Sequence, residues 1–225
     1  TGDVIDFVLV LGNSLDIGTP SDNTVTTAKL ANSSVSLAKL TATGTKDATT
    51  FLRGDNTFSA LPASGITEAD LWKKTADQQI TTNAITTNLA RVNKIGTGMT
   101  ESSGIFSFPS TGMYMITAYA SISSSGTTTK SRYILLRTVT TTNNSTYNNV
   151  ARAAGHGNAY TTSEVTYAFA STYFFNVTDT STHKVKFTIE GENQSNYYLK
   201  GTSADVYTSF QFIRLGDSVW WIIFN

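Results

Sequence analysis

Apolar and polar residues alternate in short runs through the second half of the chain, and clusters of Gly, Ser, Asn and Thr separate these runs. The alternation is clearest over residues 184–190, where every second residue is Val, Phe or Ile. Eight such runs between residues 97 and 217 are typical of a β-sandwich or jelly roll. We therefore predict an antiparallel jelly-roll head over residues 97–217, with a core that contains Phe106, Tyr114, Ile116, Val185, Phe187, Ile189 and Phe212.

Residues 65–96 lack this alternation and predict a helix. Thr67 and Asp70 form an approximate capping box, and no Gly or Pro interrupts the segment until Gly96. Residues recur at seven-residue intervals along a narrow seam with polar members, which suits a short parallel trimeric coiled coil. A single surface helix packed on a sheet is the alternative. The coiled coil would place at the trimer interface Leu71, Gln78, Ile85, Asn88, Val92 and Ile95.

A ten-residue repeat marks the first part of the chain, where residues 24–33 are echoed by residues 34–43. A unit this short cannot bury its own apolar side chains, so it needs neighbours in the same chain or in other chains. We predict a fibrous β stalk over residues 1–64, with a disordered polar linker as the alternative. Within it, residues 1–18 predict two short strands joined by a turn, and two apolar runs around residues 54–56 predict a hairpin.

The composition agrees with a mainly β protein and excludes several classes of function. The 225 residues carry 16 basic and 16 acidic side chains, so no net charge attracts nucleic acid or an anionic membrane. Without cysteine the chain has neither disulfides nor thiolate zinc sites. We expect no metal, no cofactor and no membrane insertion. The apolar tail, residues 218–225, is expected to bury against a partner subunit or another protein.

The segment GIFSFPSTGMYMITAYASI adds a resemblance to this pattern. Its spaced Gly, Phe, Pro, Gly, Tyr and Ile resemble those of the tumour-necrosis-factor-like family, in the branch that contains the globular head of the first complement component. The resemblance covers a little over half of the chain and implies a ten-stranded jelly roll that forms a tight homotrimer around a three-fold axis. The matching positions are Gly104, Phe106, Pro109, Gly112, Tyr114 and Ile116.

The first half resembles a different group of proteins. Units of the type VTTAKLA followed by FLRGDNTF are similar to the stalks of phage tail fibres, and no collagen Gly-x-y period is present. This resemblance implies a virion protein of the tail or capsid surface, assembled in the bacterial host cytoplasm and held to other virion proteins by the stalk. We predict that it attaches to a host cell-surface glycan or protein. The alternatives are a structural capsid fibre or decoration protein without a receptor, and a polysaccharide depolymerase.

Tyrosines in loop-like stretches rich in Asn, Ser and Gly are the candidate receptor-binding residues, because Tyr offers flat, amphipathic contact area at low entropic cost. They are Tyr147, Tyr160, Tyr197 and Tyr198. Packing of some of these rings across a trimer interface is the alternative.

Catalytic residues are not expected. His156 and His183 lie in different segments without a nucleophile motif. Glu190 and Glu192 could serve as paired carboxylates or calcium ligands, but carboxylates beside a turn are more often simply solvated.

Overall fold

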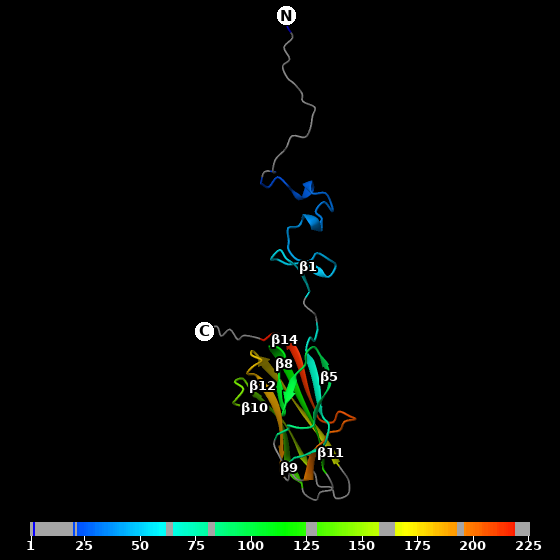
Figure 1. Ribbon diagram of the computed structural model, residues 1–225, viewed down its shortest axis with the longest axis vertical. Coiled ribbons are helices and arrows are strands. Elements are labelled where there is room, and N and C mark those ends of the chain that lie inside the picture. Colours follow the sequence, from blue (N-terminus) through cyan, green and yellow to red (C-terminus); the bar gives the residue numbers. More distant parts are fainter. Residues whose placement is uncertain are drawn as a thin grey trace. The chain divides into compact units, whose positions relative to one another are not determined.

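Two units make up the chain, Thr1–Pro62 and Ala63–Asn225 (Figure 1). The computed structural model describes residues 22–61, 65–80, 84–124, 130–157, 165–192 and 196–218, together with Gly2 and Pro20. The strands predicted for residues 1–18 and nearly all of the apolar tail lie outside these described residues. Within these described ranges, the first unit contains 3-10 turns and a hairpin, and the second contains two large β-sheets.

The ten-residue repeat of the first unit is a structural repeat. Asn23 and Ser33, ten residues apart, both have left-handed backbone angles, with φ of 63° and 65°. Each is followed by an extended segment and a single 3-10 turn, η1 (Thr27–Lys29) and η2 (Leu37–Lys39). The described part of the repeat therefore holds 3-10 turns where a β stalk was predicted, and its β pairing there is the bridge between Thr43, the last residue of the second copy, and Thr57.

A hairpin follows the repeat, as predicted. The strands β1 (Thr50–Leu52) and β2 (Phe58–Ala60) pair antiparallel, with Phe51 opposite Ser59. At the turn, Asp55 Oδ1 accepts a hydrogen bond of 3.1 Å from the Thr57 backbone N–H. Such a short-range side-chain bond to the backbone closes the turn locally.

The second unit is built from two antiparallel sheets. One is a five-stranded sheet with the order β10 (Asn148–Gly157), β9 (Ser131–Thr141), β12 (Lys184–Gly191), β7 (Ile105–Ser107) and β6 (Thr100–Ser102). The other is a seven-stranded sheet with the order β4 (Gln78–Gln79), β13 (Tyr197–Leu199), β8 (Gly112–Ser124), β14 (Ser209–Gly216), β3 (Ala69–Lys74) and β5 (Leu89–Ile95). Its seventh strand, β11 (Val165–Val177), lies off this path and pairs with β8 along its whole length.

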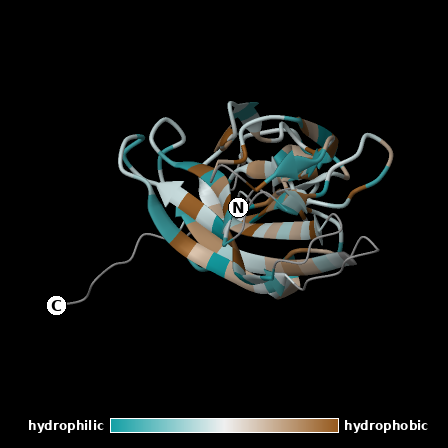
Figure 2. Cartoon of the chain, turned by 90° about the horizontal axis from the view of Figure 1, so that it is seen from below, coloured by the Kyte–Doolittle hydropathy of each residue, from teal (hydrophilic) through white to brown (hydrophobic). Residues whose placement is uncertain are grey.

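The chain crosses repeatedly between these sheets. After β7 it enters the seven-stranded sheet as β8, returns for β9 and β10, crosses to β11, returns for β12 and ends in β14. This is the connectivity of a jelly roll, which confirms the predicted class of the head. Hydrophobic and hydrophilic residues alternate along its strands, as Figure 2 shows.

Aromatic rings fill the space between the two sheets. Phe187 of β12 stacks on Phe210 of β14 with ring centroids 4.1 Å apart, and Phe106 of β7 meets the edge of Trp72 of β3 at 5.4 Å. Because these rings come from both sheets, they fix how the sheets face one another. All seven predicted core residues are buried, which confirms the assignment of inward positions.

The predicted coiled-coil helix is wrong. Residues 69–74, 78–79 and 89–95 are strands of the seven-stranded sheet and belong to the same unit as the head. In β3 the buried positions are Asp70, Trp72 and Lys74, so a period of two is present but carries charged residues inward. This inverted polarity hid the strand from a search for alternating apolar residues.

The residues of the predicted helical seam consequently lie in unrelated places. Ile85 is buried in the core of the head, and Asn88 has a left-handed backbone with φ of 55°. Gln78 lies in β4, and Val92 is the extra residue where β5 shifts register against β3. Leu71 and Ile95 remain neighbours on the outward side of the sheet.

Candidate functional site

The outward side of the seven-stranded sheet is uncharged across five adjacent strands, with a row of apolar residues beside a row that is mainly polar. The register of β11, β8, β14, β3 and β5 places side chains in rows that cross the sheet, since directly paired residues point to the same face. We call the two central rows the apolar face. It consists of Phe174, Met115, Ile213, Ala69 and Ile95 in one row, and Thr172, Thr117, Gln211, Leu71 and Asn93 in the next.

No residue of the apolar face carries a charge. Phe174 is 58% exposed and Ile95 is 51% exposed, values far above those of large apolar side chains in a core. In the row beyond, Lys73 directs its ammonium group to the carbonyl oxygen of Ser203, 2.7 Å away in the loop before β14. Contiguous exposed apolar surface of this kind marks an interaction site in soluble proteins.

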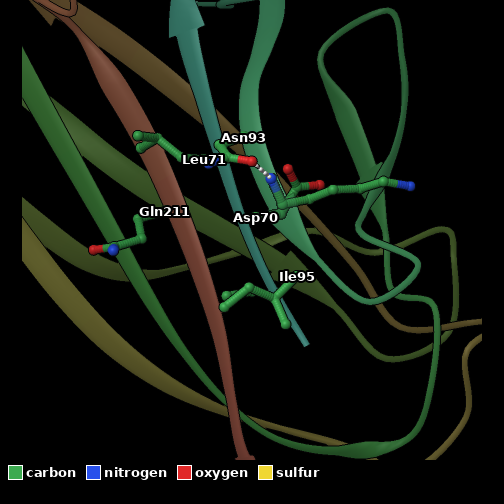
Figure 3. Close-up of a pocket in the computed structure, with 7 residues that line it drawn as sticks. Asp70, Leu71, Asn93, Ile95 and Gln211 are labelled. Carbon is green, nitrogen blue, oxygen red and sulfur yellow. Dashed lines mark hydrogen bonds between the residues drawn. The ribbon is translucent and has the colours of Figure 1, made fainter. Parts of the chain in front are cut away.

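A shallow depression of about 160 Å³ lies within the apolar face, between β5, β3 and β14. Figure 3 shows Leu71 and Gln211 on one side of the sheet and Asp70 on the opposite side. Asp70 and Lys94 also line the depression, although the residues that point outward are the ones that follow them, Leu71 in β3 and Ile95 in β5. The side chains of Leu71 and Gln211 therefore border the depression on the outward side, and the Asp70 side chain lies on the other side of the sheet.

Beneath the apolar face, a buried ion pair holds β5 and the following loop to β3. Asp70 accepts hydrogen bonds from Arg91 Nε at 3.0 Å and from the Met99 backbone N–H at 2.6 Å. The Arg91 guanidinium lies 4.7 Å over the Trp72 ring and also donates to the Met99 carbonyl oxygen. Glu68 accepts from the backbone N–H of Gly98 at 3.0 Å. These bonds position the outer strand that carries Ile95.

The four predicted receptor-binding tyrosines do not form one site. Tyr147 is half-buried beside the five-stranded sheet, with the Lys186 ammonium 4.0 Å over its ring, and burial raises the pKa of its hydroxyl. Tyr198 is half-buried in β13, opposite Gln79 of β4 in the seven-stranded sheet. Tyr160 lies outside the described residues.

The prediction that Tyr197 is exposed is wrong. Its side chain is 1% exposed, and its hydroxyl oxygen accepts a hydrogen bond of 3.2 Å from the Ser131 backbone N–H. In β13 the alternation buries Tyr197 and Leu199 and leaves Tyr198 between them at the surface. A pair of adjacent tyrosines gives no signal from sequence about which ring faces inward.

The acidic and histidine candidates lie in separate places. Glu190 pairs with Arg137, and Glu192 pairs with Arg132 at 2.6 Å, so each carboxylate is bound to its own arginine of β9. His183 packs 5.5 Å from the Phe175 ring, and burial lowers the pKa of its imidazole, whereas His156 is exposed on β10. Within the described ranges, no three His, Asp or Glu side chains cluster as a metal site would require.

Among the residues that the structure describes, no helix is long and apolar enough to cross a membrane.

No family model matches this sequence. No curated protein matches it either. Solved structures similar to the chain include murine APRIL at pH 5.0, with a TM-score of 0.48 and 11% identity over 66% of this chain and 98% of that one. The PRD1 vertex protein P5 has a TM-score of 0.42 and 18% identity over 67% of this chain and 99% of that one.

The globular domain of zebrafish complement 1qA is also similar, with a TM-score of 0.42 and 12% identity over 68% of this chain and 100% of that one. At such identities the likeness concerns the jelly-roll fold alone. The site is therefore argued from the residues of this chain.

Sequence reasoning missed most of the apolar face. Phe174, Met115 and Ile213 lie in segments where both faces of the strand are apolar, so the outward members resemble core residues. The signal present in the sequence was the near-continuous run MYMITAY, which is too apolar for a strand with one solvated side.

Proposed function

We propose that this chain is a homotrimeric virion fibre protein that attaches a bacteriophage to the surface of its bacterial host. The observation that carries the proposal is the apolar face. An uncharged, exposed face on a well-packed sheet suits permanent association, because no charged group loses hydration when the face is covered. A second and a third copy of the chain present the same uncharged surface and are the partners that we propose.

The first unit supports association along the chain. Val25 and Val35 occupy equivalent positions of the two repeats and are 53% and 54% exposed. Leu30 and Leu37 are exposed as well. A ten-residue repeat that leaves its apolar side chains in solvent gains stability when parallel copies pack beside it. Both units thus present apolar side chains that copies of the same unit could cover.

Attachment follows from what a trimer offers a surface. Three copies of one head present three copies of any weak binding site, and linked sites raise the overall affinity through effective concentration. This mode needs no deep pocket and no large net charge, and the chain has formal net charge zero. We propose a host cell-surface glycan or protein as the target.

Assembly is tested by multi-angle light scattering at micromolar concentration. We expect a mass three times the 24.2 kDa of one chain. Ile213→Asp should yield monomers, because it places a like charge from every copy in the covered face. Val206→Asp is the matched control, since Val206 is exposed in the loop before β14 and is not a residue of the apolar face, and its mass should remain that of the parent. A monomeric parent protein would refute the trimer.

Attachment is tested by adsorption of labelled protein to host cells. The parent should adsorb, and the monomeric Ile213→Asp variant should adsorb at least about tenfold more weakly because it loses multivalency. A stable trimer that does not adsorb would refute attachment and favour a structural capsid fibre. Release of reducing sugar from host polysaccharide would instead indicate a depolymerase.

A further inference from the structure

Two arginines stand directly opposite one another on the outward side of the five-stranded sheet. Arg152 of β10 pairs in register with Arg137 of β9, and Thr188 of β12 continues the row. Like charges at directly opposed positions destabilise a sheet. Glu190 binds the guanidinium of Arg137, whereas no carboxylate within the described ranges forms an ion pair with Arg152. The pair therefore holds an uncompensated positive charge.

A β-bulge beside this pair opens a hollow. The register of β10 against β9 shifts between Asn149 and Ala151, so Val150 is the extra residue. Bulges interrupt the ladder and redirect neighbouring side chains. The resulting hollow has a volume of about 420 Å³ and is lined by Arg137, Asn149, Val150, Ala151 and Arg152. That volume lies in the range of small-molecule sites.

Further cations lie on the same side of the sheet. Lys186 of β12 is opposite Val139 of β9, which is in turn opposite Asn149, so Lys186 lies across one strand from the hollow. Its ammonium group lies over the Tyr147 ring. Lys184 is two residues before it on the same face. Among the described residues of β9, β10 and β12, four cationic side chains and one carboxylate, Glu190, thus lie on this side of a chain that is neutral as a whole.

We propose that the hollow binds an anionic group carried by a saccharide, either the carboxylate of an acidic sugar or a sugar phosphate. This deepens the proposed function and rests on it, since it names the class of surface glycan that the head engages. Arg152 supplies the planar, two-pronged donor that matches carboxylate and phosphate oxygens, and Arg137, which is paired with Glu190, lines the hollow beside it. Asn149 can bond ring hydroxyls, and Val150, the extra residue of the bulge, offers apolar contact to the C–H face of a sugar ring.

The arrangement favours a saccharide over a nucleic acid. A nucleic-acid surface requires a stripe of cations that follows successive phosphates. Here the unpaired charge is concentrated at one hollow, and the other arginine of the row already has Glu190 as a partner. One anionic group at a time is what this geometry accommodates.

Calorimetric titration of the assembled protein tests the proposal. Tetragalacturonate and mannose 6-phosphate are the two anionic probes, and maltotetraose is the neutral counterpart of the first. We expect at least one anionic probe to bind, with an affinity that falls as salt rises, and maltotetraose not to bind. Which of the two probes binds more tightly distinguishes a carboxylate ligand from a phosphate ligand.

Arg152→Gln should weaken binding of the preferred probe at least tenfold without lowering thermal stability, because it also removes the like-charged neighbour of Arg137. Arg132→Gln is the matched control: Arg132 lies on β9 with its side chain 83% exposed, pairs with Glu192 and does not line the hollow. Its affinity for the probe should stay within about twofold of the parent.

Two outcomes would overturn the proposal. Absence of binding by both anionic probes would do so, as would equal losses in the Arg152→Gln and Arg132→Gln variants, which would show only diffuse attraction. These failures are separable from failure of the proposed function. A trimer that adsorbs to host cells but binds neither probe retains attachment and loses the anionic site. A trimer that binds a probe but does not adsorb retains the site and loses attachment.

Discussion

Replacement of Asp70 by Asn should destabilise the head far more than the same replacement at an exposed ion pair. The Asp70 carboxylate is 1% exposed and accepts from Arg91 Nε at 3.0 and 3.1 Å. Asparagine keeps the shape of the side chain and an oxygen that can accept from the Met99 N–H. Asp70→Asn therefore removes the charge and leaves the guanidinium of Arg91 without a carboxylate.

The magnitude follows from the burial of the two partners. Removing one member of a buried pair costs about 3–5 kcal/mol, because the other charge remains without compensation. The Arg91 side chain is 33% exposed, so water recovers part of that loss. We expect the free energy of unfolding to fall by about 2–4 kcal/mol, which for a domain of this size lowers the urea midpoint by roughly 1–2 M.

Asp217→Asn is the matched control. Asp217 also pairs with an arginine, Arg214, at 2.6 Å, but its side chain is 97% exposed. An exposed pair contributes little, so this variant should lose no more than about 0.5 kcal/mol. Both variants are unfolded in urea and followed by far-ultraviolet circular dichroism at one fixed protomer concentration, since association is linked to stability. Equal losses in the two variants would refute the reasoning that burial decides the cost.

Two further perturbations test the interior. Phe187→Ala should cost about 3–5 kcal/mol in urea unfolding because the ring is enclosed and stacked on Phe210; a loss below about 1 kcal/mol would contradict this packing. Burial lowers the pKa of Lys74 to about 8 from a usual 10.5, although its ammonium donates to Gln78 Oε1 and to the Thr87 carbonyl oxygen. The unfolded chain then binds more protons above pH 8, so stability should rise with pH. Relative to Lys74→Met, the parent should gain about 2 kcal/mol between pH 7 and 9.5, and parallel pH profiles would contradict the lowered pKa.

The core of the head could be predicted because strand alternation is a local property of the sequence. In β12 every second side chain is apolar, and in the structure Val185, Phe187 and Ile189 are all buried. Each residue's face follows from its neighbours within a few positions, without knowledge of the strands beside it. The same local rule does not tell where one strand ends and the next begins. Residues 165–177 form the single strand β11, which continues through the polar residues Ser171 and Thr172.

The same reasoning failed for β3 because its inward residues are charged. Asp70 is stabilised by Arg91, which is 21 residues away in the sequence, and Lys74 by the Thr87 carbonyl oxygen, 13 residues away. A buried charge is acceptable only once such partners are in place. The partners depend on the tertiary fold, so no local pattern could indicate that the polar positions of this segment point inward.

Both candidate surfaces depend on register, which the sequence alone does not specify. Phe174 and Ile95 are members of one row only because four strand pairings align them. Arg137 and Arg152 face one another only because the bulge at Val150 shifts β10 by one residue after Asn149. Without the bulge the side chains of the shifted part of β10 would point to the other face, since strand side chains alternate with a period of two.

The two sheets of the head separate the proposed roles physically. The apolar face belongs to the seven-stranded sheet and the arginine pair to the five-stranded sheet, with the aromatic core between them. Copies that associate through one sheet therefore leave the outward side of the other uncovered at the positions of Arg137 and Arg152. Substitutions at the two surfaces have no shared partners, so their effects should be additive. For that reason Ile213→Asp should change the mass of the assembly and the avidity for cells, while the affinity of a single head for an anionic probe should be unchanged. A loss of single-site affinity in that variant would show that the hollow is completed by a neighbouring copy.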